Sequence, residues 1–200
     1  MFLADMARKV EFDIDQALHK AMKLFWLKGY DATSMQDLVD VMEINRFSIY
    51  NSFGDKKTLY ITVLAYYRET VLGYLIKPLK ANAPAKKRLN DYLLLMSEQL
   101  QSKSGALGCM IQNAGLSPVS KDVDVAEILT LLFSDLKTAL LAVIEEAIEE
   151  GSISTSTYNA GVLTDFILGQ IQGLIILRKT LRNTDGVDAQ IALLRQVVGC

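Results

Sequence analysis

Histidine and cysteine are scarce in this chain of 200 residues, which contains one His and two Cys. Structural zinc sites take four ligands, mostly from Cys and His, and His19, Cys109 and Cys200 do not supply such a set. A single histidine also leaves little for general acid–base catalysis. The chain has neither a Ser/His/Asp set nor a glycine-rich phosphate loop. We therefore expect no metal, no cofactor and no enzymatic activity.

Long apolar runs are also missing, although half of the residues are hydrophobic. The longest candidates, residues 129–133, 139–144 and 166–177, end in or are interrupted by polar residues, short of the roughly 18–20 that a membrane span needs. Residues 1–10 show no apolar core before their charges, so we expect no signal peptide. With two cysteines a disulfide framework is not expected, and the sequence predicts a cytoplasmic chain without membrane contact. The apolar excess then indicates an oligomer interface or a binding cavity.

Helical periodicity is found along the chain, and no window shows strand alternation with hairpin turns. Asp13 and Gln16 have the spacing of a capping box before a helix that ends at about Lys28, where Gly29 can terminate it. The sequence predicts an all-α fold with about nine helices. Later helices are expected at about residues 56–77, where Pro78 ends the helix, and at 84–100, 122–150, 158–181 and 187–198.

Residues 33–59 have the pattern of two short helices joined by a tight turn. Ser34 or Thr33 can cap the first helix, whose inward residues are Leu38 and Val41. Asn45 can cap the second helix, which runs to about Phe53. This arrangement predicts a helix-turn-helix, in which the N-terminal residues of the second helix reach base edges in the DNA major groove.

The polar residues of this stretch suggest a division between reading bases and holding phosphates. Arg46 can contact guanine O6 and N7, whereas Asn45, Ser48 and Phe47, the last against a thymine methyl, are weaker readers. An Asp cap and two lysines at the start of the next helix indicate a phosphate clamp. The predicted DNA-binding residues are Thr33, Ser34, Asn45, Arg46, Phe47, Ser48, Tyr50, Asn51, Lys56 and Lys57.

These motifs resemble the tetracycline-repressor (TetR) family of transcription regulators over about residues 12–62. The resemblance is carried by Gly29-Tyr30-Asp31-Ala32-Thr33-Ser34, Asp37-Leu38, Ile44-Asn45, Ile49-Tyr50, Phe53-Gly54-Asp55-Lys56 and Leu59. It implies a helix-turn-helix DNA-binding domain at residues 1–57 and a helical effector-binding and dimerisation domain at 58–200. It also implies a regulator, most often a repressor, that binds palindromic operator DNA as a homodimer and is released by a small-molecule effector. Two positions depart from the family: Glu43 stands where Gly is usual, and Phe47 where a small residue is common.

A basic surplus, which strong non-specific DNA binders show, is absent. The chain has 21 Lys and Arg against 23 Asp and Glu, and residues 1–57 hold eight basic against nine acidic residues. We expect the charges to be sorted by face within the domain. The acidic side would carry Asp13, Asp15, Asp37 and Asp40, and the groove side Arg46, Lys56 and Lys57.

The resemblance implies a pocket for an unknown small molecule among the middle helices. Residues that mix apolar and hydrogen-bonding surface there are Tyr66, Tyr67, Tyr92, Met96, Cys109, Met110 and Asn113. Each of them could instead pack in the core. Cys109 is either a sensor thiol beside a helix start, with a lowered pKa, or a small buried hydrophobe.

The last two helices are more apolar than one buried stripe requires. Gly169 and Gly173, one turn apart, leave a groove in which another helix can approach closely. The region therefore predicts a homodimeric four-helix interface, and the alternative is an ordinary buried core helix. The predicted interface residues are Phe166, Gly169, Gln170, Gly173, Leu174, Leu177, Ile191, Leu194 and Val198.

Two functions other than a DNA-binding regulator are compatible with an all-α chain of this length. One is a small all-α enzyme, and the other is a helical protein-binding adaptor without DNA-binding activity. Neither needs hydrogen-bond donors at a helix start followed by a lysine pair, which is the pattern of residues 45–57.

Overall fold

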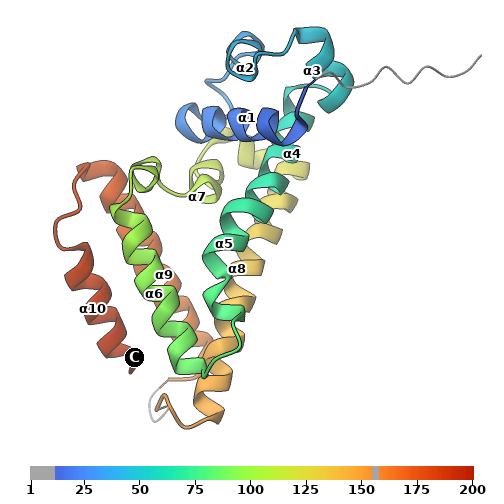
Figure 1. The fold of residues 1–200 in the computed structure, drawn as a ribbon. Coiled ribbons are helices and arrows are strands. Elements are labelled where there is room, and N and C mark those ends of the chain that lie inside the picture. The colour runs from blue at the N-terminus through green and yellow to red at the C-terminus, as the bar shows by residue number, and fades with distance from the viewer. Residues whose placement is uncertain (1–11, 155–157) are drawn as a thin grey trace, which may run out of the picture. The chain divides into compact units, whose positions relative to one another are not determined.

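The computed structural model describes residues 12–154 and 158–200, and these residues form an all-helical fold (Figure 1). The segment 1–11, for which no signal peptide was predicted, lies outside the described residues. The chain divides into two compact units, Met1–Tyr66 and Tyr67–Cys200. The prediction of an all-α chain with about nine helices is confirmed for the described residues. Ten α segments are present, of which α4 and α5 follow one another through a π-helical turn.

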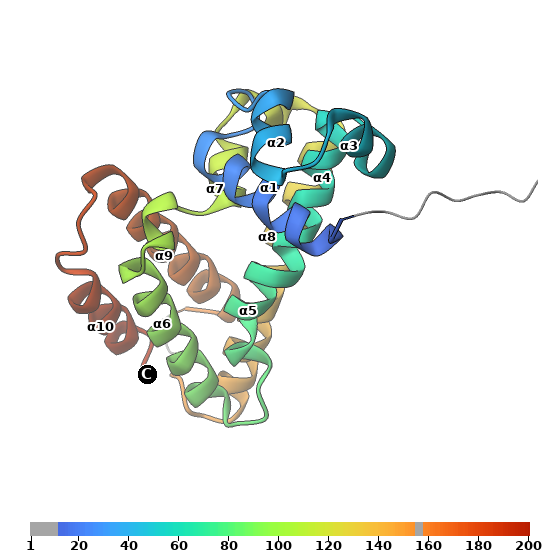
Figure 2. The same cartoon turned by 45° about the horizontal axis from the view of Figure 1, so that its top comes forward.

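The first unit contains α1 (Ile14–Lys28), α2 (Met35–Met42), α3 (Arg46–Phe53) and most of α4 (Lys56–Tyr67). Each predicted cap is confirmed: Asp13 accepts from the Gln16 N–H at 3.0 Å, Ser34 forms a capping box with Asp37, and Asn45 accepts from the Ser48 N–H at 2.9 Å. Helix α2 contacts both α1 and α3, as Figure 2 shows. These caps satisfy N–H groups that the first turn of a helix leaves without partners.

The first unit extends further along the chain than the predicted domain boundary after residue 57. Leu59 and Tyr60 are buried, and the Tyr60 ring meets the Phe25 ring of α1 with the centroids 4.9 Å apart. The start of α4 therefore completes the core of the first unit. A pattern of helical periodicity could not show this, because it continues through residues 57 and 66 alike.

The second unit contains α5 (Gly73–Ile76), α6 (Ala85–Gln101), α7 (Met110–Gly115), α8 (Val123–Glu149), α9 (Ala160–Leu181) and α10 (Val187–Val197). Within it, α8 packs against α6 and α9, and α10 packs chiefly against α6 (Figure 1). A π-helical turn, Arg68–Leu72, precedes α5 where the sequence predicted regular helix. Its Arg68 Nε lies 2.5 Å from Asp135 Oδ2 of α8.

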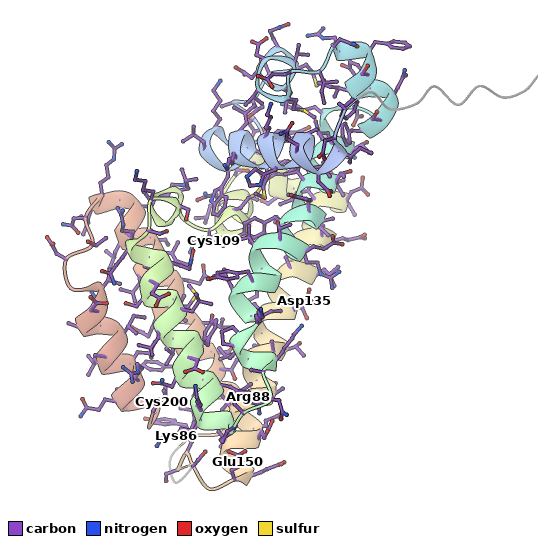
Figure 3. All side chains as sticks on the ribbon, viewed as in Figure 1. Lys86, Arg88, Cys109, Asp135, Glu150 and Cys200 are labelled. Atoms are coloured by element: carbon purple, nitrogen blue, oxygen red, sulfur yellow. The ribbon has the colours of Figure 1, made fainter. Side chains whose placement is uncertain are left out.

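The N-terminus of α6 is held to the C-terminal end of α8 by polar contacts (Figure 3). The Ala85 N–H donates to the Glu150 carboxylate at 3.2 Å. The Arg88 guanidinium donates to the Leu79 carbonyl at 3.1 Å and forms an ion pair with Glu146. Ala85 and Leu79 are buried. The polar contacts therefore lie beside apolar packing and hold the start of α6 in place at this end of the second unit.

Helix α9 is long and apolar enough to cross a membrane if only length and composition are considered, and 39% of its most apolar window is buried within the structure. Its buried residues include Leu163, Ile167, Leu168 and Ile171. The rest of the helix presents apolar side chains on the surface of the unit, a pattern that also suits a protein interface.

Gly105 tests how tightly the segment after α6 is packed. A Cβ at this position would collide with the Gln99 carbonyl oxygen and lie 2.6 Å from the Leu100 carbonyl oxygen. Because these are backbone atoms of α6, we expect Gly105→Ala to lower the free energy of unfolding by about 1–3 kcal/mol. Gly115, in α7, is the matched control: its Cβ would meet nothing within 4 Å, so Gly115→Ala should raise that free energy by about 0.4–1 kcal/mol. Urea unfolding followed by circular dichroism measures both changes, and equal effects would contradict this packing.

Candidate nucleic-acid interface

The turn between α2 and α3 is formed by Glu43 in a left-handed conformation, with φ 59° and ψ 35°. Its N–H donates to the Val39 carbonyl at 3.0 Å. A residue with a Cβ in this conformation costs roughly 1 kcal/mol or more relative to glycine. The Glu43 carboxylate forms an ion pair with Lys20 of α1, and the hydrogen bond from Lys20 lowers the pKa of Glu43. The turn therefore keeps the helix-turn-helix geometry without glycine.

Helix α3 has one buried face and one outward face. Ile49 and Phe53 are buried within the first unit. The outward residues include Phe47, whose side chain is 64% exposed, together with the exposed residues Arg46, Tyr50 and Asn51. The structure thus brings together on one helix the residues predicted to contact bases.

Two polar side chains near the start of α3 are restricted as base readers. The Asn45 Oδ1 atom accepts from the Ser48 N–H at 2.9 Å and is occupied by capping. Ser48 itself is half-buried. Arg46 forms no hydrogen bond or ion pair with another residue of the described chain, so its guanidinium remains available to a ligand.

Thr33 and Ser34 support the motif from within the protein. Thr33 is only 1% exposed, and its hydroxyl donates to the Gly29 carbonyl at 2.7 Å. The prediction that the Thr33 side chain contacts DNA is therefore wrong, because it has no surface to offer. Ser34 is exposed, and its side chain caps α2. Hydrogen bonds to the Asp37 carboxylate, the strongest from Lys28 and others from Ser34, hold the pKa of Asp37 well below its usual range.

Lys56 has an internal partner set that the sequence did not reveal. Its Nζ donates to the carbonyls of Tyr30 at 3.0 Å and Thr33 at 2.9 Å, and lies 4.2 Å from the centroid of the Tyr30 ring. An ammonium group has three donors, and two of them hold the turn between α1 and α2. The structure therefore gives Lys56 a positioning role, and its contact with a phosphate stays a prediction.

The start of α4 otherwise follows the prediction. The Asp55 carboxylate accepts from the Thr58 N–H at 2.8 Å and from its hydroxyl at 2.9 Å, so the Asp cap is confirmed. These two bonds, with a smaller contribution from Lys57, lower the pKa of Asp55. The role of Lys57 as a phosphate contact stays a prediction.

The residues predicted for an effector pocket separate into several places. Tyr67, Tyr92 and Met110 are buried in the second unit, and the Tyr67 hydroxyl is hydrogen-bonded to the Cys109 thiol. Met96 is buried on α6. Asn113 donates to the Leu107 carbonyl and accepts from Lys179 at 2.6 Å. Tyr66 is half-buried and is the last residue of the first unit. A pocket formed by these residues stays a prediction.

The environment of Cys109 (labelled in Figure 3) favours an unreactive thiol. Burial raises its pKa, and this outweighs the N–H groups of Gln112 and Ile111 at the start of α7, which lower it. Burial also raises the pKa of the neighbouring Tyr92, and the Cys109 charge adds to that effect. A high thiol pKa means little thiolate near neutral pH, and the thiolate is the nucleophile.

The residues predicted for a dimer interface divide into exposed and buried positions, and their contact with a second copy stays a prediction. Phe166, Gly169, Gln170, Gly173 and Leu177 are exposed together on α9, whereas Leu174 is buried. On α10, the predicted residues Ile191, Leu194 and Val198 are buried within the chain's own unit, where α10 packs mainly on α6. These three side chains pack inward, so they offer little surface to a second copy.

The outward apolar residues of α10 are Leu193 and Val197, which are 59% and 56% exposed. They form a shorter stripe, one residue before Leu194 and Val198. The other apolar stripe of α10 is longer and contains residues 187, 191, 194 and 198, all of them buried. Its greater length is the feature of the sequence that could have identified it as the face packed inward.

Comparisons with known proteins point to the same motif. The model for bacterial regulatory proteins of the tetR family matches residues 17–63. The uncharacterised HTH-type transcriptional regulator YezE of Bacillus subtilis (strain 168) is 25% identical over 193 residues, which cover 94% of this chain and 100% of that protein. The HTH-type transcriptional repressor ComR of Escherichia coli (strain K12) is 37% identical over 115 residues, covering 56% of this chain and 55% of that protein.

A solved structure of a similar protein includes DNA. A cysteine-substituted form of the TetR family transcriptional regulator CifR, complexed with 26-bp double-strand operator DNA, superposes with a TM-score of 0.81 at 25% identity. The match covers 93% of this chain and 97% of that chain. The likeness therefore includes both units and not the helix-turn-helix alone.

The positioning role of Lys56 leads to a stability difference between two adjacent lysines. We expect Lys56→Ala to lower the free energy of unfolding of the first unit by about 1 kcal/mol, because two carbonyls lose a charged donor. Lys57→Ala, the matched control, leaves those bonds in place and should cost clearly less. Fluorescence of Trp26, the chain's single tryptophan and a residue of α1, reports on unfolding of this unit in urea. Equal losses for the two variants would contradict the assignment.

Proposed function

This chain belongs to the tetR family of bacterial regulatory proteins, and from that premise we propose that it represses transcription as a cytoplasmic homodimer. Each protomer places α3 in the major groove of one half of a near-palindromic operator. A small-molecule effector releases the dimer from DNA. The protein acts by binding, without a catalytic step.

The outward face of α3 carries this proposal. Arg46, Phe47 and Tyr50 face solvent at a helix whose opposite face, Ile49 and Phe53, is buried. In a helix-turn-helix the N-terminal residues of the second helix meet base edges, and a dimer reads half-sites about 34–36 Å apart or a multiple of that spacing. Arg46 is the strongest reader in this set, since a guanidinium can bond guanine O6 and N7 together.

DNA binding is tested by comparing Arg46→Ala with Lys57→Ala. Arg46→Ala should cost roughly 1–3 kcal/mol on the selected site and relax preference at one base pair per half-site. Lys57→Ala should weaken all sequences alike and reduce the salt slope by about one phosphate per subunit. Both variants are titrated against selected and scrambled duplexes at several salt concentrations. If the wild type enriches no duplex from a random library, the function is that of a protein-binding adaptor instead.

The homodimer is proposed to form through the exposed face of α9, with Leu193 and Val197 of α10 beside it. A Cβ at Gly173 would meet nothing within 4 Å in the protomer, so Gly173→Leu should leave the fold intact while it separates the subunits. Gly115→Leu, also in open space but on α7, is the matched control and should remain dimeric. Analytical ultracentrifugation at micromolar concentration measures the state of each, and a monomeric wild type would overturn the interface.

The effector is proposed to act on the second unit, near the buried side chains of Tyr67 and Tyr92 and the half-buried Cys109. Such a ligand weakens DNA binding only if its affinity differs between DNA-competent and incompetent states. Coupling between sites is typically about 1–3 kcal/mol. Helical backbone continues from α4 through the π-helical turn into α5, so the chain passes from one unit to the other without an intervening loop.

A further inference from the structure

The exposed face of α3 carries two aromatic side chains beside Arg46, whereas DNA-binding surfaces are usually cationic. Phe47 is the second residue of the helix and is 64% exposed, and Tyr50, one turn later, is also exposed. Isolated apolar side chains on a surface are common, so exposure alone assigns nothing to Phe47. Its position does, because residues at the start of this helix are those that reach base edges.

The polar alternatives at the same end of α3 are limited. Asn45 Oδ1 is bonded to the Ser48 N–H, and Ser48 is half-buried. Three lysines of the first unit are engaged within it: Lys20 with Glu43, Lys28 with Asp37, and Lys56 with two carbonyls. Arg46 is exposed and, among the described residues, has no hydrogen-bond or ion-pair partner, so it is the polar side chain at the start of α3 that is most available to a ligand.

In the major groove the apolar feature that distinguishes base pairs is the C5-methyl group of thymine. We propose that Phe47 is a specificity-determining residue that packs against a thymine C5-methyl group in each half-site, so that the protein discriminates a methyl group and not only hydrogen-bond donors. This inference rests on the proposed DNA-binding function. The phenyl ring has no hydrogen-bonding group, and its gain on binding therefore depends on apolar contact area.

Thymine replaced by deoxyuridine provides the test, because the substitution removes the methyl group and keeps the Watson–Crick and groove hydrogen-bonding atoms. The probes are duplexes that the wild-type protein enriches from a random library, resynthesised with deoxyuridine at each thymine in turn. Burial of one methyl-sized group is worth a factor of about four in affinity. We expect about a fourfold loss at one thymine position in a single half-site, and about fifteenfold when both half-sites are changed.

A rescue arm separates the methyl group from the identity of the base. Cytosine at the sensitive position weakens binding, and 5-methylcytosine restores the methyl at the same place in the groove. We expect 5-methylcytosine to bind more tightly than cytosine by a factor of about four. Equal affinity for cytosine and 5-methylcytosine, with no loss at any deoxyuridine, would overturn the proposal.

The Phe47→Ala variant assigns the effect to its side chain. It should bind thymine and deoxyuridine duplexes equally, whereas Phe47→Leu should keep part of the preference. Leu27→Ala is the matched control, since Leu27 is an exposed apolar residue of α1, 69% exposed, and should keep the full preference. A preference that persists in Phe47→Ala shows that another residue reads the methyl and contradicts the inference. If the wild type selects no duplex at all, the proposed DNA-binding function fails. If it selects a duplex but Phe47 does not determine the methyl preference, only this inference fails.

Discussion

Burial of Ile49 and Phe53 fixes the rotation of α3 about its own axis, and what the first unit presents to a partner depends on that rotation. A turn of about 100° per residue separates neighbouring side chains on a helix, so the two buried residues determine that Phe47, Tyr50 and Asn51 face outward. The Asn45 cap and the left-handed Glu43 turn set where the helix begins. The binding surface is therefore specified by apolar packing on the opposite side of the helix.

Three lysines of the first unit bond groups of the same unit and stabilise its turns. Lys20 pairs with the left-handed Glu43, Lys28 with the capping residue Asp37, and Lys56 with the carbonyls of the turn after α1. A cation held this way releases few counterions on binding DNA, and counterion release dominates non-specific affinity. The near balance of charge in residues 1–57 agrees with this use, and it places more of the sequence preference on direct contacts to the bases.

Local signals in the sequence predicted the parts of the fold that depend on neighbours along the chain. Asp13, Ser34, Asn45 and Asp55 cap their helices as expected, because capping bonds reach only two or three residues. Predictions missed side chains that bond backbone carbonyls of the turn after α1, whether the partner is four residues away, as Gly29 is from Thr33, or more than twenty, as for Lys56. The Thr33 hydroxyl and the Lys56 ammonium find carbonyls of the turn after α1, and helical spacing alone contains no record of such folded contacts.

The sequence also could not show which of two apolar stripes on a helix packs inward. Both stripes of α10 are apolar, and the one with Ile191, Leu194 and Val198 turns inward because α6 is its nearest partner. Asp188 and Arg195 fix this choice: Asp188 accepts from the Ser97 hydroxyl at 2.6 Å, and Arg195 donates to Asn90 at 2.7 Å. Polar bonds on both sides of an apolar stripe cost a great deal to break when the helix rotates, so α10 has one orientation. Leu193 and Val197 must then lie outside, whether or not a second copy covers them.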